Sequence, residues 1–335
     1  MLRYFLFALK VRSSLKGSSF IVTSLVVNAD CMEWLAAREP NSIDAIVTDP
    51  PYGIGYMGAA WDDLPPGKDW AELCLAALKP GAHLLAFGAT RTWHRLAAAI
   101  EDAGFEMRDS IAWLHSQGFP KGSNLKPAFE PIVVARKPFT GSSEANQARW
   151  GTGELDIENN RIATTDRFGG GAKGSSGFVA GYSGEGWTPG NESGRWPANV
   201  ILDESEAESL DLLTDNASRY FFVAKANKFE RPEVNGVKHK TVKPVALMRH
   251  LVRLATPPGG LVVDTFAGSG ATVEAAILEG YDVIGIEREA EYIPLIEFRV
   301  KRAQGLPSDD SVGESTDANQ SPRNGDDGVW NIFAD

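Results

Sequence analysis

The segment LVVDTFAGSGATVEAAILEGYDVIGIE, residues 261–287, constrains the fold of this chain more than any other stretch. A β-branched apolar run precedes two glycines, Gly268 and Gly270, and a helical pattern follows them. A second apolar run, DVIGIE, then ends at Glu287. Two short buried strands joined by a helix form the crossover unit that parallel sheets require. The segment therefore predicts an open parallel sheet with helices on its faces.

Strands and helices also alternate along the N-terminal part of the chain. Apolar runs predict strands at 24–30, 43–49, 82–88, 105–114 and 130–137, and helical spacing predicts helices at 30–39, 68–81 and 93–104. We expect Lys79-Pro80-Gly81 to close the second helix and Thr92 to cap the third. The last two strands follow each other without a helix and should pair antiparallel. The predicted fold class is α/β, a doubly wound, mostly parallel sheet with an antiparallel strand pair.

This alternation stops in the middle of the chain. Residues 166–194 hold ten glycines in 29 positions, a density that disfavours regular structure. We therefore interpret 141–237 as an inserted glycine-rich region between two halves of one domain. The predicted organisation is a loose N-terminal extension at 1–20, a first half at 21–140, the insertion, a second half at 238–303 and an acidic disordered tail at 304–335.

Charge and cysteine content narrow the function classes. The formal net charge is −11, but seven acids against Arg323 give the tail −6 and leave −5 for the remaining residues. Overall acidity is thus a weak argument against a nucleic-acid partner. Only Cys31 and Cys74 are present, without CxxC or metal-ligand histidine spacing, so we expect no disulfide framework, no metal and a cytoplasmic protein. The apolar N-terminus is too short to cross a membrane.

The glycine turn predicts a cofactor that contains a nucleoside. Glycines between a strand and a helix let the backbone approach a ligand, and a carboxylate at Glu287 suits ribose hydroxyls. A dinucleotide site usually has a third glycine, but Val273 occupies that position. Asp264 ends the preceding strand, where it would repel a pyrophosphate and could bind an ammonium group. These residues favour S-adenosylmethionine over NAD.

A second unusual stretch, TDPPYGIGY at 48–56, follows the apolar run IDAIVT. Two prolines can continue neither a parallel strand nor a helix, so they stiffen a strand end, where α/β folds hold their chemistry. DPPY, followed downstream by KTVKP and DTFAGSG, resembles the beta-class DNA amino-methyltransferases of the DNA methylase N-4/N-6 family. The resemblance spans residues 24–303. GFPKGSNLKPAFEPIVVARKP and GRWPANVI further resemble phage- and prophage-type members.

The resemblance implies methyl transfer from S-adenosylmethionine to an exocyclic amine of a base in double-stranded DNA, as in restriction–modification. Asp49 and the carbonyl of Pro50 would accept the two N–H groups of the amine, Pro51 would stiffen this pair, and Tyr52 would stack on the extruded base. In the family, Asp at the head of this motif usually goes with adenine-N6 and Ser with cytosine-N4. We expect adenine-N6 methylation, with 141–237 as the target-recognition region.

The resemblance also assigns cofactor contacts. Phe266 should lie against the adenine ring of the cofactor, with Gly268 and Gly270 beside its methionine part. Thr241, Lys243 and Pro244 match the segment that packs on the methionine end. The family's sheet needs one more strand beside the Glu287 strand. The run SLVVNAD can supply this strand, and Asp30 could then receive the adenine amino group.

Basic residues after Gly88 and in the 114–129 loop could bind DNA phosphates: Lys121, Lys126, Arg91 and Arg95. Solvated surface is the alternative interpretation of these four residues. Alternatives for the whole protein are an N4-cytosine methyltransferase, an NAD-linked oxidoreductase and a DNA-binding module without catalysis. An oxidoreductase would leave the DPPY stretch unexplained. The sequence leaves open a homodimer, a cognate restriction nuclease and the recognised DNA sequence.

Overall fold

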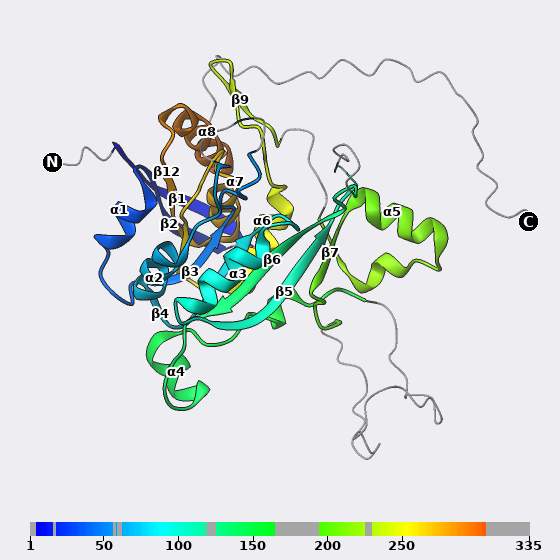
Figure 1. The fold of residues 1–335 in the computed structure, drawn as a ribbon, viewed down its shortest axis with the longest axis horizontal. Helices are drawn as coiled ribbons and strands as arrows, with labels where there is room; N and C mark the ends of the chain where they lie inside the picture. Colours follow the sequence, from blue (N-terminus) through cyan, green and yellow to red (C-terminus); the bar gives the residue numbers. More distant parts are fainter. Residues whose placement is uncertain are drawn as a thin grey trace, which may run out of the picture.

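A computed structural model describes residues 5–305, apart from 16–17, 56–57, 59–61, 117, 119–124, 165–193 and 225–229. Within these residues, ten strands form one sheet in the order β1-β2-β12-β11-β3-β4-β6-β5-β7-β8 (Figure 1). The strands are β1 (Phe5–Leu15), β2 (Ser18–Asn28), β3 (Ile43–Thr48), β4 (Leu78–Phe87), β5 (Glu106–Leu114), β6 (Phe129–Arg136), β7 (Val200–Asp203), β8 (Phe222–Ala224), β11 (Leu261–Asp264) and β12 (Asp282–Glu287). A small separate hairpin pairs β9 (Glu233–Val234) with β10 (Val237–Lys238).

Helices cover both faces of the sheet. The α-helices are α1 (Cys31–Ala36), α2 (Lys68–Ala77), α3 (Trp93–Asp102), α4 (Ser143–Trp150), α5 (Glu204–Leu213), α6 (Val245–Ala255), α7 (Ala271–Glu279) and α8 (Ile293–Ala303), and the short 3₁₀ turns are η3 (Glu158–Asn160), η4 (Ala217–Tyr220) and η5 (Ala290–Tyr292). α1, α2 and α3 bury one apolar cluster against the sheet, and α6, α7 and α8 bury another on the opposite face. No helix in the described ranges is long and apolar enough to span a membrane.

The predicted fold class is confirmed. β2, β12, β11, β3 and β4 run parallel to one another, each joined to the next in the sheet by parallel pairing. β6 is antiparallel to both β4 and β5, so the antiparallel pair expected from the last two N-terminal strands is present. The βαβ unit of β11, α7 and β12 has the form that its sequence predicts.

The strand expected beside the Glu287 strand is also found, because β2 pairs parallel with β12 and places Asn28 opposite Glu287. The chain before it differs from the prediction. Residues 1–20 were expected to be a loose extension, but Phe5–Leu15 forms β1, which pairs antiparallel with β2 along its full length. A period-2 pattern is weak there, so the strand was not evident from the sequence.

Two further expectations need correction, and a third lies mostly outside the described residues. The second helix ends at Ala77, and Lys79-Pro80-Gly81 lies within β4, where Gly81 N donates to the carbonyl oxygen of Lys137. The region 141–237 does not stand apart from the sheet, because β7 and β8 extend it beyond β5. Most of the glycine-rich stretch at 166–194 and of the tail at 304–335 lies outside the described residues.

Close packing behind the glycine turn explains the missing third glycine. Val273, fully buried on α7, faces Gly285 on β12. A Cβ on Gly285 would lie 2.5 Å from Val273 Cγ2. The small residue that lets the helix approach the strand therefore stands on the strand, while the helix carries the larger side chain.

Candidate active site

The carboxyl ends of β2, β3, β11 and β12 meet at one edge of the sheet and border a cavity of about 1140 Å³. Both sequence motifs line it, although they lie in opposite halves of the chain. The predicted residues on its wall are Asp30, Asp49, Pro50, Pro51, Tyr52, Thr241, Lys243, Asp264, Phe266, Gly268 and Glu287. Pro244 and Gly270 lie behind the wall, where they begin α6 and α7. The fold thus brings together the predicted catalytic and cofactor-binding residues.

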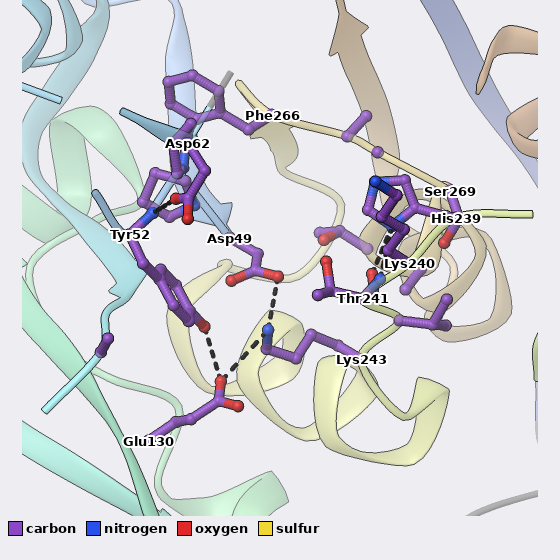
Figure 2. Close-up of a pocket in the computed structure, with 18 of the residues that line it drawn as sticks. Asp49, Tyr52, Asp62, Glu130, His239, Lys240, Thr241, Lys243, Phe266 and Ser269 are labelled. Atoms are coloured by element: carbon purple, nitrogen blue, oxygen red, sulfur yellow. Dashed lines mark hydrogen bonds and ion pairs between the residues drawn. The ribbon is translucent and has the colours of Figure 1, made fainter. Parts of the chain in front are cut away.

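Asp49 belongs to a network of polar side chains that point toward one another in Figure 2. Its Oδ2 accepts a hydrogen bond of 2.6 Å from Lys243 Nζ. Lys243 also lies 3.3 Å from Glu130 Oε2, which accepts a 2.7 Å hydrogen bond from the Tyr52 hydroxyl. The other carboxylate oxygen, Asp49 Oδ1, is buried without a hydrogen-bond partner among the described residues. The network therefore fixes one side of Asp49, a residue of the cavity wall, and leaves its second carboxylate oxygen without a hydrogen bond from the described residues.

The electrostatics of this network keep Lys243 charged. Burial alone would lower the pKa of Lys243, but the Asp49 and Glu130 carboxylates outweigh burial and raise it above its ordinary value. Burial, followed by the same two carboxylates, raises the pKa of the Tyr52 hydroxyl well above its ordinary value. At neutral pH the site holds an ammonium group between two carboxylates, beside a neutral phenol.

The loop that carries the motif is held by Asp62, whose backbone and side chain are buried. Its carboxylate accepts hydrogen bonds from the backbone N–H groups of Tyr52, Gly53 and Ile54 at 2.6, 2.9 and 3.3 Å. Thr92 does not cap α3 through its side chain as expected, and its hydroxyl instead donates to the Tyr52 carbonyl at 2.6 Å. These bonds, added to the two prolines, immobilise the backbone around Asp49.

Two buried carboxylates define the other half of the cavity. Asp264 Oδ1 accepts from Thr48 Oγ1 at 2.7 Å and from Phe266 N at 3.1 Å. Burial raises the pKa of Asp264 to about 6. Glu287 accepts from Gly268 N and from Glu289 N, both at 2.7 Å, and burial raises its pKa to about 7. Both groups are therefore close to titration at neutral pH.

The glycine turn lies close to His239, which also lines the cavity. Gly268 has φ of +52°, and a Cβ there would lie 3.0 Å from His239 Nε2. His239 also packs edge-on against Tyr292, with ring centroids 4.6 Å apart, and burial lowers its pKa. Its Nδ1 lies 2.5 Å from the carbonyl oxygen of Thr241, so it orders the segment that leads to Lys243.

The remaining cofactor candidates lie on the same side of the cavity. Phe266 is half-buried and contacts Trp70 with ring centroids 5.9 Å apart. Asp30 caps α1, and its Oδ1 accepts from Met32 N at 2.8 Å. Its carboxylate also borders the cavity.

The predicted DNA contacts lie at or near the mouth of this cavity. Arg91 and Lys126 are exposed and line the cavity. Arg95 is exposed in an adjoining hollow that Arg91 shares. Lys121 lies outside the described residues. In the described part of the chain, no group of three or more His, Cys, Asp and Glu side chains could hold a metal ion.

Sequence reasoning missed Glu130, Asp62 and His239. Glu130 opens the run EPIVVARK, where an acid at the start of an otherwise apolar strand was the available signal. His239 directly precedes the KTVKP motif, so the motif already pointed to this segment as part of the site. Asp62 gave no signal, because its partners are backbone groups of another turn of the same loop.

Comparison with known proteins identifies the family. A family model described as DNA methylase, of the N6/N4 methyltransferase type, matches residues 43–298. The chain belongs to this DNA methylase family. Members are S-adenosylmethionine-dependent methyltransferases, so the enzyme transfers a methyl group from this cofactor to DNA. The resemblance on which the motifs were assigned is thereby confirmed.

Individual relatives of this DNA methylase are distant but cover most of it. The type II methyltransferase M.HpaI of Haemophilus parainfluenzae is 24% identical over 82% of the chain and 73% of its own length. The type II methyltransferase M2.DpnII of Streptococcus pneumoniae is 22% identical over 83% of the chain and 89% of its own length. Among solved structures, the cytosine-N4-specific PvuII DNA methyltransferase shares the fold, with a TM-score of 0.52, 16% identity and 91% of each chain covered.

Proposed function

We propose that this DNA methylase methylates the N6 amine of adenine in double-stranded DNA. The observation that carries the proposal is Oδ1 of Asp49, a buried acceptor that has no hydrogen-bond partner among the described residues and that belongs, with Pro50 and Pro51, to the cavity wall. An exocyclic amine is a poor nucleophile, because its lone pair is delocalised into the ring. Two fixed acceptors, Asp49 Oδ1 and the Pro50 carbonyl, can each take one N–H and turn the lone pair out of conjugation.

Lys243 and Glu130 position these acceptors. Because Lys243 occupies Asp49 Oδ2, the carboxylate can rotate little, and Oδ1 keeps its position. Glu130 holds Lys243 on one side and the Tyr52 hydroxyl on the other. The Tyr52 ring is thereby fixed beside Asp49, where it can stack on a base. Preorganisation of this kind reduces the cost of aligning the reacting groups.

The second half of the cavity suits S-adenosylmethionine. Asp264 can accept from the ammonium of the methionine part, and Glu287 from ribose hydroxyls. The absence of a side chain at Gly268 leaves room beside His239, where a Cβ would be crowded at 3.0 Å. Phe266 offers a face for the adenine ring, and Asp30 an acceptor for its amino group. The bound cofactor would supply an electrophilic methyl group on a sulfonium.

A base that remains stacked in a duplex cannot bring its amine to Asp49 on the wall of this cavity, so the proposal requires that the target base be extruded. The exposed Arg91, Arg95 and Lys126 border its mouth and could bind the phosphates that flank the extruded nucleotide. Lys121 belongs to the same proposal by its place in the sequence. We place the activity in DNA modification of the restriction–modification kind, because two relatives are named type II methyltransferases.

The second candidate is N4-cytosine methylation, because a carboxylate and a carbonyl could serve either amine. We favour adenine because Asp, rather than Ser, stands at the head of the motif. The test is methylation of unmethylated genomic DNA with deuterated S-adenosylmethionine, followed by mass spectrometry of the nucleosides. Labelled N6-methyldeoxyadenosine is expected. Labelled N4-methyldeoxycytidine alone would show that the second candidate, N4-cytosine methylation, is the activity. The Asp49→Ala protein serves as the inactive control.

A further inference from the structure

Two side chains on the cavity wall carry polar atoms that the proposed chemistry does not use. Trp113 and His115 line the cavity, and each is 8% exposed. Trp113 Nε1 and both ring nitrogens of His115 are buried without a hydrogen-bond partner among the described residues. Buried polar groups are normally paired, but in the described part of the chain Trp113 Nε1 and His115 Nδ1 have no partner, and His115 Nε2 has only the Glu130 carboxylate, at 3.6 Å.

The strand β5 fixes the two residues on the same side of the sheet. Trp113 lies in β5 and His115 directly follows its last residue, Leu114, and side chains two positions apart in an extended chain share a face. Their rings are tilted at 46° with centroids 5.0 Å apart. His115 is further anchored by its backbone N–H, which donates to the Ala128 carbonyl at 3.0 Å. The pair is therefore a fixed wall.

Glu130 connects this wall to the acceptor network. Tyr52 donates to Glu130 Oε2 at 2.7 Å, while His115 Nε2 lies 3.6 Å from Glu130 Oε1. His115 and Tyr52 thus stand on either side of one carboxylate (Glu130 and Tyr52 are labelled in Figure 2). A base that stacks on Tyr52 with its amine at Asp49 would have its ring edge near the β5 wall.

The chemistry of the wall matches a purine edge. The indole N–H of Trp113 can only donate, and the imidazole of His115 carries at least one N–H in every protonation state it adopts at neutral pH. Adenine has ring nitrogens that accept hydrogen bonds on both sides of its amine, whereas cytosine has one acceptor and one C–H in these places. Two donors therefore suit adenine better than cytosine.

We propose that Trp113 and His115 read the ring edge of the extruded target base, by donating hydrogen bonds to the ring nitrogens beside its exocyclic amine. The proposal rests on the proposed function, since it takes Asp49 as the acceptor of the amine. It makes the end of β5 a specificity-determining element. Asp49 and Pro50 then engage the amine, while the β5 wall distinguishes the base that carries it.

The test uses DNA analogues at the methylated position. Methylation-sensitive long-read sequencing first gives the recognised site. Duplexes are then made with adenine, 7-deazaadenine or 1-deazaadenine at the target, so that one ring nitrogen at a time becomes C–H. Single-turnover methyl transfer is measured for the wild type, Trp113→Phe, His115→Ala and His115→Gln. The exposed Trp196, outside the cavity lining, gives the matched control Trp196→Phe. Circular dichroism and cofactor titration report folding.

We expect Trp113→Phe and His115→Ala each to slow methylation of adenine about tenfold, as does the loss of one hydrogen bond with its partner left unpaired. On the analogue that lacks its partner nitrogen, each variant should methylate as fast as the wild type does, because the substitution and the analogue remove the same hydrogen bond. His115→Gln, which keeps a donor, should recover part of the rate, and Trp196→Phe should not differ from wild type.

Fully additive losses on both analogues, or wild-type rates for both variants, would overturn the proposal. If Trp113→Phe fails to fold, the His115→Ala comparison decides alone. If the wild type methylates cytosine, the proposed adenine specificity is wrong, but the wall can still be tested with 3-deazacytosine. A slower wild type on that analogue, together with no additional loss in His115→Ala, would support the ring-edge contact, and additive losses would overturn it.

Discussion

Lys243 Nζ lies 2.6 Å from Asp49 Oδ2, although the two residues are 194 positions apart in the chain. Asp49 follows β3, and Lys243 stands just before α6, so the pair joins the two halves of the domain. The Lys243 side chain is only 8% exposed, and the ion pair is therefore largely shielded from water. Any change at Asp49 removes an acceptor from the cavity and also weakens the pairing of a buried ammonium group.

The first prediction concerns catalysis by Asp49. Asp49→Ala should slow methyl transfer about 100- to 1000-fold, the usual cost of removing a preorganised group from a transition state. Asp49→Asn should fail almost as badly, because its amide can present a donor where an acceptor is needed. S-adenosylmethionine should still bind, since Asp49 faces the base side of the cavity. Labelled methyl incorporation and calorimetry measure the two effects, and near wild-type incorporation would refute the acceptor role.

The same substitution should also affect stability. A strand-end acid predicts little change from the sequence alone, but the buried partner alters this expectation. Asp49→Ala should lower the free energy of unfolding by about 1–3 kcal/mol, less than for a fully orphaned charge, because Glu130 stays 3.3 Å from Lys243. Urea denaturation measures the loss. Asp63→Ala, at an exposed acid nearby, is the matched control and should change stability little.

The second prediction separates two roles for Lys243. If Lys243 positions Asp49, Lys243→Met should lower kcat about 100-fold through misplacement of the acceptor, while the Kd for S-adenosylmethionine stays nearly constant. Lys243→Arg should keep part of the activity, because it keeps the charge. A large rise in the cofactor Kd with little change in kcat would instead place Lys243 at the methionine end, as the family resemblance implies.

Much of this site could be predicted because its parts are local. The stiff DPPY turn and the glycine turn each depend on residues close in sequence, so their patterns identified two strand ends. The parallel sheet then had to bring these ends to one edge. Glu130 and Asp62 escaped prediction, because their roles come from hydrogen bonds across strands and loops that no periodicity encodes. β1 escaped although it is long, because its alternation is weak, and β7 and β8 escaped because strands of four and three residues carry little pattern.

The third prediction tests the packing that replaces the third glycine. Gly285→Ala places a Cβ 2.5 Å from Val273 Cγ2, so it should destabilise the protein by roughly 1–3 kcal/mol. Val273→Ala in the same protein should recover a large part of this loss, because it removes the clashing methyl group. Thermal or urea unfolding of the two single variants and the double variant measures the coupling. Additive losses would show that the helix does not press on this strand.

The fourth prediction concerns DNA binding. Affinity should fall as salt rises, with the slope set by the number of phosphate contacts. Ala substitution at Arg91, Arg95 and Lys126 should each reduce the slope of log K against log salt by about one. Fluorescence anisotropy with a duplex containing the methylation site measures it. Arg38→Ala, on an exposed arginine that packs over Trp34, is the control. An unchanged slope for all three variants would show that other residues contact the phosphates.

The fifth prediction follows from the two buried carboxylates. Burial raises the pKa of Glu287 from 4.5 to about 7 and that of Asp264 from 3.8 to about 6. Between about pH 4 and 7 the folded protein thus binds more protons than the unfolded chain. The stability that these groups contribute is fully present below their ordinary pKa values, which hold in the unfolded chain, and it is lost as pH rises through the raised pKa values of the folded protein. The free protein should become less stable over this range, and Glu287→Gln should reduce the loss near pH 7.

Cofactor binding should follow the opposite course. In the proposed binding mode, ionised Glu287 accepts hydrogen bonds from ribose hydroxyls and ionised Asp264 from an ammonium group, so S-adenosylmethionine should favour the deprotonated carboxylates. Its affinity should rise between pH 5 and 8, by up to about tenfold per pH unit for each carboxylate below the pKa of that carboxylate, with release of protons on binding. Calorimetry in two buffers of different ionisation enthalpy measures both quantities. Glu287→Gln should flatten the rise near pH 7 and leave the part below pH 6, which belongs to Asp264. An affinity that stays constant across this range would show that neither carboxylate binds the cofactor.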